Sequence, residues 1–285
     1  MSVQKIHRPF SLLLGALLLV LGACNDPEPT PAYILVEDVS LSTTPGQGAA
    51  TEDIKDIWVF IDDLFLGVYD LPARIPVLAE GTTEVRFEFG VRENGITRLP
   101  NIYEFYAPVE EIIDVVPGET YDMGTLSIRY RSDARFAMLE NFEPDRNRLF
   151  LDVLIGGASL NPSTELARSG TAAGKIELTE LDSQFEVITI TNYSDLGLNI
   201  WLEVDVLADV PVVWGIVGRT TAGIERFYEV GSLANSEWTK LYFNMTPEIF
   251  RSQLDSYSIG LTTFIQEEGQ ETGTVFLDNL KLVHF

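Results

Sequence analysis

The chain is poor in the side chains that carry most nucleophilic and metal chemistry, because its 285 residues include one cysteine and two histidines. No disulfide can form within the chain, and zinc is disfavoured because zinc sites normally take several Cys or His ligands. The single thiol is Cys24, and His7 precedes it. After removal of the first residues, only His284 could serve as the base of a Ser-His-Asp triad. At the end of a predicted strand, His284 is better explained as an ordinary packed or solvated side chain.

Basic residues are scarce as well. The chain has 19 Lys and Arg against 43 Asp and Glu, which gives a formal net charge of -24. Such a chain repels the phosphates of nucleic acids and anionic lipid surfaces. It also has no Walker-type G-x-x-x-x-G-K-[ST] and no strand followed by G-x-G-x-x-G. We therefore expect neither a nucleic-acid partner nor nucleotide chemistry.

Long hydrophobic runs are missing except at the start, where residues 10–21 (FSLLLGALLLVL) follow Lys5 and Arg8. A helix that spans a membrane needs about 20 apolar residues. A shorter apolar run after a few positive charges is typical of a signal peptide. The sequence therefore predicts that residues 1–23 are a signal peptide.

The end of this leader, Leu21-Gly22-Ala23-Cys24, resembles the lipobox of bacterial lipoproteins. The resemblance implies that cleavage makes Cys24 the first residue and that its sulfur carries a diacylglyceryl group, usually with a further acyl chain on the amine. Two or three acyl chains anchor a protein stably, whereas one binds only marginally. The alternative is an ordinary secretory peptide with a cysteine at this place by chance.

Residues 24–32 are rich in proline and acids, which predicts an extended polar tether. Acids directly after the lipidated cysteine resemble the signal by which Bacteroidota export lipoproteins to the cell surface. These resemblances together imply a protein that a lipid anchor holds in the outer membrane, facing the outside of the cell.

From residue 33 onward, apolar residues recur with a period of two, which is typical of β-strands. Residues 83–91 (TEVRFEFGV) place their apolar side chains on one face, and residues 57–61 (IWVFI) are apolar on both faces, as in a central strand. Asp62-Asp63 and Asn94-Gly95 follow these runs, and Asn-Gly favours a hairpin turn because both central residues need positive φ. About seven such strands predict an immunoglobulin-like β-sandwich over residues 33–130.

An arginine-rich segment (129–135) marks the boundary to a second domain, residues 131–285. Its alternating segments predict strands at 175–181, 185–191, 200–207, 212–217, 240–245, 256–264 and 274–283. Thr246-Pro247-Glu248 predicts a short helix with Thr246 as its N-cap, and residues 161–168, closed by Gly170, predict another. Eight or more strands favour a β jelly roll. The fold class predicted for the whole chain is therefore all-β, an immunoglobulin-like sandwich followed by a jelly roll.

Five short segments of the second domain resemble jelly-roll domains of the carbohydrate-binding-module and galactose-binding-like type. They are LENFE (139–143), SGTAAGKIEL (169–178), NIWLEVDV (199–206), SEWTKLYFN (236–244) and VFLDNLKLV (275–283). The whole chain resembles outer-membrane lipoproteins of Bacteroidota that accompany glycan-uptake systems. Fold-level likeness alone does not carry a function.

The same resemblance implies a structural calcium ion that ties the first strand to the last. The matching positions are Glu143 and Asp278, with Glu140 a poorer match, and carboxylates are suitable calcium ligands. The alternative for Asp278 is that its carboxylate accepts hydrogen bonds from backbone amides.

Candidate ligand-binding residues lie on the predicted strand 200–207. Trp201, Glu203 and Asp205 share one face with Asn199, and the opposite face is apolar. An aromatic ring can stack on a pyranose while carboxylates bind its hydroxyls. The alternative is a solvent-facing strand whose tryptophan covers a loop. Trp238, just before the predicted strand 240–245, and Tyr242, on the polar side of that strand, are further candidates, with ordinary packing as the alternative.

These observations predict a non-catalytic, surface-anchored lipoprotein that binds a polysaccharide or serves as an accessory component of an outer-membrane system. Two alternatives remain open. One is a structural or interaction subunit of an outer-membrane transport or secretion complex. The other is a carboxylate-based glycosidase or lyase, which needs only two suitably placed acids, with Glu203 as the candidate.

Overall fold

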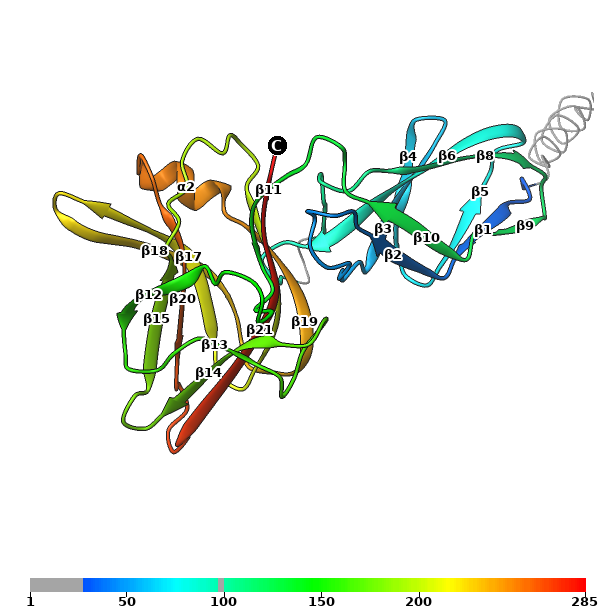
Figure 1. Cartoon of the computed structure of the whole chain (residues 1–285). Helices are drawn as coiled ribbons and strands as arrows, with labels where there is room; N and C mark the ends of the chain where they lie inside the picture. Colours follow the sequence, from blue (N-terminus) through cyan, green and yellow to red (C-terminus); the bar gives the residue numbers. More distant parts are fainter. Residues whose placement is uncertain (1–27, 97–99) are drawn as a thin grey trace, which may run out of the picture.

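The computed structural model describes residues 28–96 and 100–285. They form two lobes built almost entirely of β-strands (Figure 1), so the predicted all-β fold class is confirmed. The predicted signal peptide, Cys24 and the first residues of the tether lie outside the described residues. No helix within residues 28–96 and 100–285 has the length and apolar character needed to cross a membrane.

The N-terminal lobe is a β-sandwich centred on the long strand β6. Its strands are β1 (Ala32–Val36), β2 (Asp38–Ser42), β3 (Asp56–Ile61), β4 (Leu64–Asp70), β5 (Ala73–Val77), β6 (Gly81–Arg92), β7 (Pro100–Ile102), β8 (Val109–Val115), β9 (Thr120–Asp122) and β10 (Thr125–Arg129). β6 pairs with β3 on one side and with β7 and β8 on the other, and β4 forms the edge beside β3. β1 pairs with β5 and β9, and β2 pairs with β10.

The sequence predicted the inner faces of this lobe correctly. Val85, Phe87, Phe89 and Val91 of β6 are all at most 1% exposed, and β3 lies between β4 and β6 as a central strand should. Both residues of Asp62-Asp63 and of Asn94-Gly95 adopt positive φ, which is the conformation that the predicted hairpin turns require. The immunoglobulin-like classification stays a prediction.

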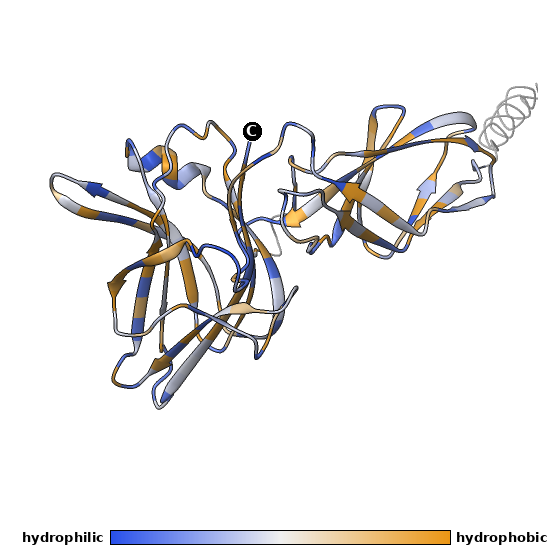
Figure 2. Cartoon of the chain, in the orientation of Figure 1, coloured by the Kyte–Doolittle hydropathy of each residue, from blue (hydrophilic) through white to orange (hydrophobic). Residues whose placement is uncertain are grey.

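The C-terminal lobe is a second sandwich, of two facing sheets. Its elements are β11 (Arg135–Glu140), β12 (Phe150–Ile155), β13 (Asn161–Ser163), β14 (Ala173–Thr179), β15 (Gln184–Thr189), β16 (Trp201–Ala208), β17 (Val212–Thr220), β18 (Gly223–Ser232), β19 (Asn235–Asn244), α2 (Thr246–Ser252), β20 (Ser258–Phe264) and β21 (Thr272–His284). One sheet has the order β13-β14-β21-β16-β19, with β11 also paired to β21, and the other has the order β12-β15-β20-β17-β18. From β14 on, the chain crosses repeatedly from one sheet to the other, as in a jelly roll. Along the strands of both lobes, hydrophobic and hydrophilic residues alternate (Figure 2).

Two local predictions for this lobe were wrong. Residues 161–168 do not form a helix, because the chain there pairs as β13 with the edge of β14 and then bends; strand pairing provides backbone partners that override a weak helical pattern. α2 is present, but its N-cap is Met245. The hydroxyl of Thr246 instead accepts a hydrogen bond from the N–H of Ile200 at 2.8 Å.

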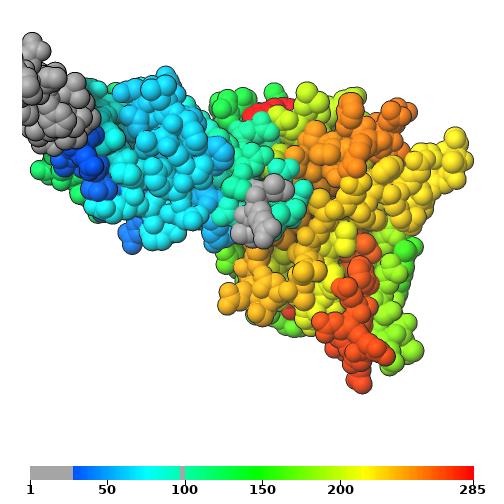
Figure 3. Space-filling view, turned by 180° about the vertical axis from the view of Figure 1, so that it is seen from behind, coloured from blue at the N-terminus to red at the C-terminus, as the bar shows by residue number. Residues whose placement is uncertain are grey.

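The two sandwiches share a hydrophobic cluster. Trp201, Tyr242 and Val283 of the second sandwich belong to the same buried cluster as Tyr103 and Phe105 of the first. Seen from behind, the lobes meet along a continuous surface (Figure 3). The chain therefore folds as two sandwiches that pack tightly against each other.

Candidate functional site

The strand face that the sequence proposed as a glycan platform is covered by the N-terminal sandwich. Trp201, Glu203 and Asp205 of β16 are 3%, 0% and 0% exposed, and Tyr242 of β19 is 1% exposed. Trp238 is half-buried on β19. The expectation that the Trp201 face is open, either to a glycan or to solvent, is therefore wrong. Another part of the same chain occupies it.

Glu203 is the centre of a buried polar cluster at this junction. Its carboxylate accepts hydrogen bonds from the hydroxyls of Tyr103 and Tyr130, each at 2.8 Å. It also lies 3.1 Å from Nζ of Lys240 and 3.9 Å from Nζ of Lys281. Tyr103 belongs to the first sandwich, and Tyr130 directly follows its last strand, β10. Both lysines belong to the second sandwich. One carboxylate thus joins both sandwiches.

The charges of the cluster set one another's ionisation. Burial opposes the charged form of Glu203, but Lys240, Lys281 and the two tyrosine hydroxyls more than offset it, so the pKa of Glu203 lies below its ordinary value. Burial lowers the pKa of Lys281 to about 8, although Glu203 acts in the opposite direction. An ionised, enclosed carboxylate with both oxygens engaged is poorly suited to the acid role that the glycosidase alternative requires.

The lowered pKa of Lys281 gives a testable pH dependence. In the unfolded chain this amine has its ordinary pKa of about 10.4, so the unfolded state binds more protons between pH 8 and pH 10. The free energy of unfolding should therefore rise with pH in this range. Urea denaturation at stepped pH measures the slope, and Lys281→Met should flatten it. An identical slope in the variant would show that Lys281 titrates normally in the folded protein.

A second set of hydrogen bonds fixes the loop between β2 and β3 to the same face. One oxygen of Asp205 accepts hydrogen bonds from the hydroxyl of Thr51 at 2.7 Å and from the amide of Asn279 at 2.9 Å. The hydroxyl of Tyr242 accepts the N–H of Asp53 at 3.2 Å. Asp205 and Tyr242 therefore hold the two sandwiches together and are closed to a large ligand.

The carboxylates that were matched to a calcium site accept hydrogen bonds, most of them from backbone N–H groups. Asp278 accepts two backbone N–H groups from the loop that begins at Arg168, at 3.1 and 3.0 Å. Glu143 accepts the N–H and the hydroxyl of Thr171 at 2.7 and 2.5 Å, and Glu140 accepts two further backbone N–H groups.

A calcium ion at this place would have to share these carboxylates with their N–H and hydroxyl donors. Within the described part of the chain, no group of three or more His, Cys, Asp and Glu residues could hold a metal ion. For Asp278 the structure shows the alternative arrangement, acceptance of backbone amides, and calcium binding stays a prediction.

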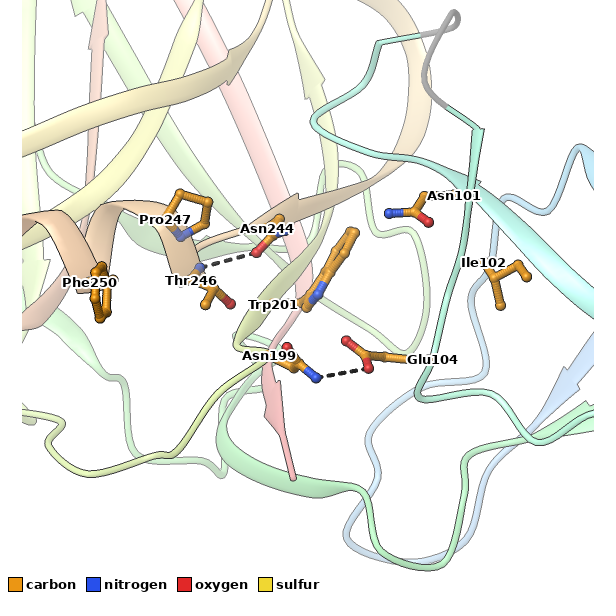
Figure 4. Close-up of a pocket in the computed structure, with 9 residues that line it drawn as sticks. All are labelled: Asn101, Ile102, Glu104, Asn199, Trp201, Asn244, Thr246, Pro247 and Phe250. Carbon is orange, nitrogen blue, oxygen red and sulfur yellow. Dashed lines mark hydrogen bonds between the residues drawn. The ribbon is translucent and has the colours of Figure 1, made fainter.

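A pocket of about 540 Å³ opens where the two sandwiches meet beside α2 (Figure 4). Both sandwiches line it, with Asn101, Ile102 and Glu104 from the first and Asn199, Trp201, Asn244, Thr246, Pro247 and Phe250 from the second. We call it the junction pocket. Among the ligand-binding residues predicted from the sequence, Trp201 lines this pocket.

The polar groups of the junction pocket are held in place by contacts across the junction. The carboxylate of Glu104 accepts a hydrogen bond from the amide of Asn199 at 2.9 Å. Burial raises the pKa of Glu104, with Arg131 and Asn199 opposing the shift. The ring of Trp201 packs edge to face against Tyr103, with 5.3 Å between centroids, and its indole nitrogen lies on the side of Asn199 and Glu104 (Figure 4). Oriented polar groups therefore converge beside an indole ring that is itself only 3% exposed.

Phe250 stands at the rim of this pocket with 78% of its surface exposed. The sequence placed it only as part of a short helix. Neighbours in a helix are rotated by about 100°, so Ile249, which packs against the core, and Phe250 cannot both face inward. That spacing is the signal by which the exposed aromatic ring could have been found.

Comparison with known proteins finds only distant structural likenesses. No protein-family model and no curated protein matches the chain. Among solved structures, one is a carbohydrate-binding module from a study of promiscuous specificity in the β-sandwich superfamily, at 13% identity, covering 90% of this chain and 99% of that one, with a TM-score of 0.39. Another is the CBM22-2 xylan-binding domain of Paenibacillus barcinonensis Xyn10C, at 11% identity, 52% and 99% coverage and a TM-score of 0.40. A family 29 carbohydrate-binding module in complex with mannohexaose gives 13% identity, 53% and 91% coverage and a TM-score of 0.36.

Proposed function

We propose that the chain is a non-catalytic, lipid-anchored protein that binds a glycan in the junction pocket. The observation that carries this proposal is the lining of the pocket, which combines the exposed ring of Phe250 with the side chains of Asn101, Asn199, Asn244 and Glu104. Ligand sites of this size typically pair apolar rings with a few oriented polar groups, and a sugar offers one apolar face and a rim of hydroxyls. The named carbohydrate-binding modules are similar in fold alone, so no ligand is transferred from them.

The position of β1, the first described strand, supports a lipid anchor at Cys24. β1 lies at the end of the N-terminal lobe that is far from the C-terminal lobe (Figure 1). A tether attached there would place the junction pocket at the other end of the N-terminal lobe from the anchor. In this arrangement, the N-terminal sandwich is a spacer that also completes one wall of the pocket.

Affinity electrophoresis through gels that contain xylan, β-glucan or mannan tests glycan binding. We expect retardation by at least one polysaccharide. Asn199→Gly should weaken it by about fivefold to tenfold, as the loss of one or two hydrogen bonds implies. Glycine is the suitable replacement because Asn199 has φ of 60°, a conformation that glycine adopts without strain.

A matched control is Asp63→Gly, which also replaces a residue of positive φ, 63°, in the β3–β4 turn of the first sandwich. Its retardation, measured against its own migration in a gel without polysaccharide, should equal that of the unaltered protein. Free migration in every gel, or equal retardation of Asn199→Gly and the unaltered protein, would count against glycan binding in the junction pocket.

A second candidate function, an interaction subunit, is favoured by the edge strand β4. Leu64, Phe65 and Val68 are 74%, 55% and 40% exposed, and β4 lies at the end of its sheet. An exposed edge strand with mostly apolar side chains can pair with another chain. Stoichiometric co-purification of a membrane protein that Phe65→Glu abolishes would favour this function.

A further inference from the structure

A second pocket adjoins the junction pocket on the other side of Phe250. Its volume is about 710 Å³, and it lies between α2 and the segment that precedes β16. Its lining includes Asp195, Leu198, Ile200, Phe250 and Asp255. Phe250 lines both pockets. Asn199 and Trp201 line the junction pocket, and Ile200 between them lines the second pocket. The two hollows are therefore neighbouring parts of one surface.

The charges of this surface have a single sign. Glu104 lines the junction pocket, and Asp195 and Asp255 line the second pocket. Neither described lining contains Lys, Arg or His. The net charge of -24 adds to the local negative potential. A ligand that carries carboxylates or sulfates would meet repulsion, most strongly beside Asp195 and Asp255, because the cation of Arg131 acts on Glu104.

Two large apolar side chains project from the same surface. Phe250 is 78% exposed and Leu198 is 72% exposed. Phe250 lies on α2 and Leu198 on the facing segment, and both line the second pocket. Exposed apolar groups beside a pocket are typical of binding sites, and they suit the C–H face of a sugar ring.

We infer that the two pockets form one groove for an extended, uncharged oligosaccharide that passes over Phe250. This inference rests on the proposed function and specifies its ligand by length and charge. Each pocket alone falls within the about 300–1,000 Å³ that holds a small ligand. A chain of sugars that fills both therefore makes contacts that a short one cannot.

Isothermal titration calorimetry of the full chain tests the length of the ligand. The probes are xylo-, cello- and manno-oligosaccharides of two to eight sugars. We expect the affinity for the binding series to rise by at least about tenfold from the shortest to the longest member. Phe250→Ala should remove most of this gain. Because Phe250 is exposed, the variant should fold normally, and Phe65→Ala, an exposed phenylalanine of β4, is the matched control.

Polygalacturonate and alginate test the charge of the ligand, and both should bind at least about tenfold more weakly than the neutral series. Equal affinity for all lengths, equal loss in the Phe250 and Phe65 variants, or tight binding of an acidic glycan would overturn the inference while leaving glycan binding itself intact. If no glycan of either kind binds, the proposed function fails and the inference fails with it.

Discussion

Replacing Glu203 with alanine is expected to lower the free energy of unfolding by about 3–5 kcal/mol, the usual cost of removing one partner from a buried ion pair. Glu203 is fully buried, and its carboxylate is the shared partner of Lys240 and Lys281. Without it, two enclosed ammonium groups face each other with no anion between them. The hydroxyls of Tyr103 and Tyr130 lose their acceptor at the same time.

Urea denaturation measures this loss, with Glu237→Ala on the exposed side of β19 as the control. Replacing the whole charged group together, as Glu203→Leu with Lys240→Met and Lys281→Met, should restore most of the lost stability. Buried ion pairs often contribute little beyond well-packed apolar residues of similar volume. A loss below about 1 kcal/mol for Glu203→Ala would mean that the junction is open to water.

Replacing Cys24 with alanine is expected to abolish acylation of the protein completely. If the lipobox resemblance is correct, Cys24 is the only residue that can carry the diacylglyceryl group, since the chain has no other cysteine. Two or three acyl chains give stable anchoring, at about 0.8 kcal/mol per buried methylene. Metabolic labelling with a radioactive fatty acid should therefore mark the unaltered protein and leave the variant unlabelled.

Mass spectrometry provides the complementary measurement. The first peptide of the unaltered protein should begin at Cys24 and carry the mass of its acyl chains, and Asn25→Ala should leave this peptide acylated. An unmodified thiol at Cys24, or a leader still attached to the mature chain, would contradict the lipid anchor and with it the proposed outer-membrane location.

Periodicity predicted which residues of a strand share a face, but not what covers that face. For β6 the inward side was clear, because the apolar residues from Val85 to Phe89 alternate with charged residues. For β16 both sides are buried, the apolar one by the facing sheet and the polar one by the first sandwich. An aromatic ring with two carboxylates has the composition expected for a sugar site, and the same composition serves a polar domain interface.

The candidate site was only partly predictable for a related reason. Trp201 and Asn199 were singled out on one strand face, and the structure places both in the junction pocket. Glu104 reaches this pocket from the other sandwich, and no local pattern indicates such a meeting of distant segments. The Asn94-Gly95 turn is similar: its φ values were predictable, but the hydrogen bond from the N–H of Asn94 to the carbonyl of Tyr242, at 2.8 Å, depends on how the lobes pack.

If the Glu203 cluster and the shared aromatic core join the two sandwiches, the lobes must unfold together. Differential scanning calorimetry of the full chain tests this most directly, because cooperative unfolding gives equal calorimetric and van't Hoff enthalpies. We expect one transition with matching enthalpies, and its division into two in Glu203→Ala. Two separate transitions in the unaltered protein would show that the sandwiches are independent, and would contradict the buried junction from which the pocket is built.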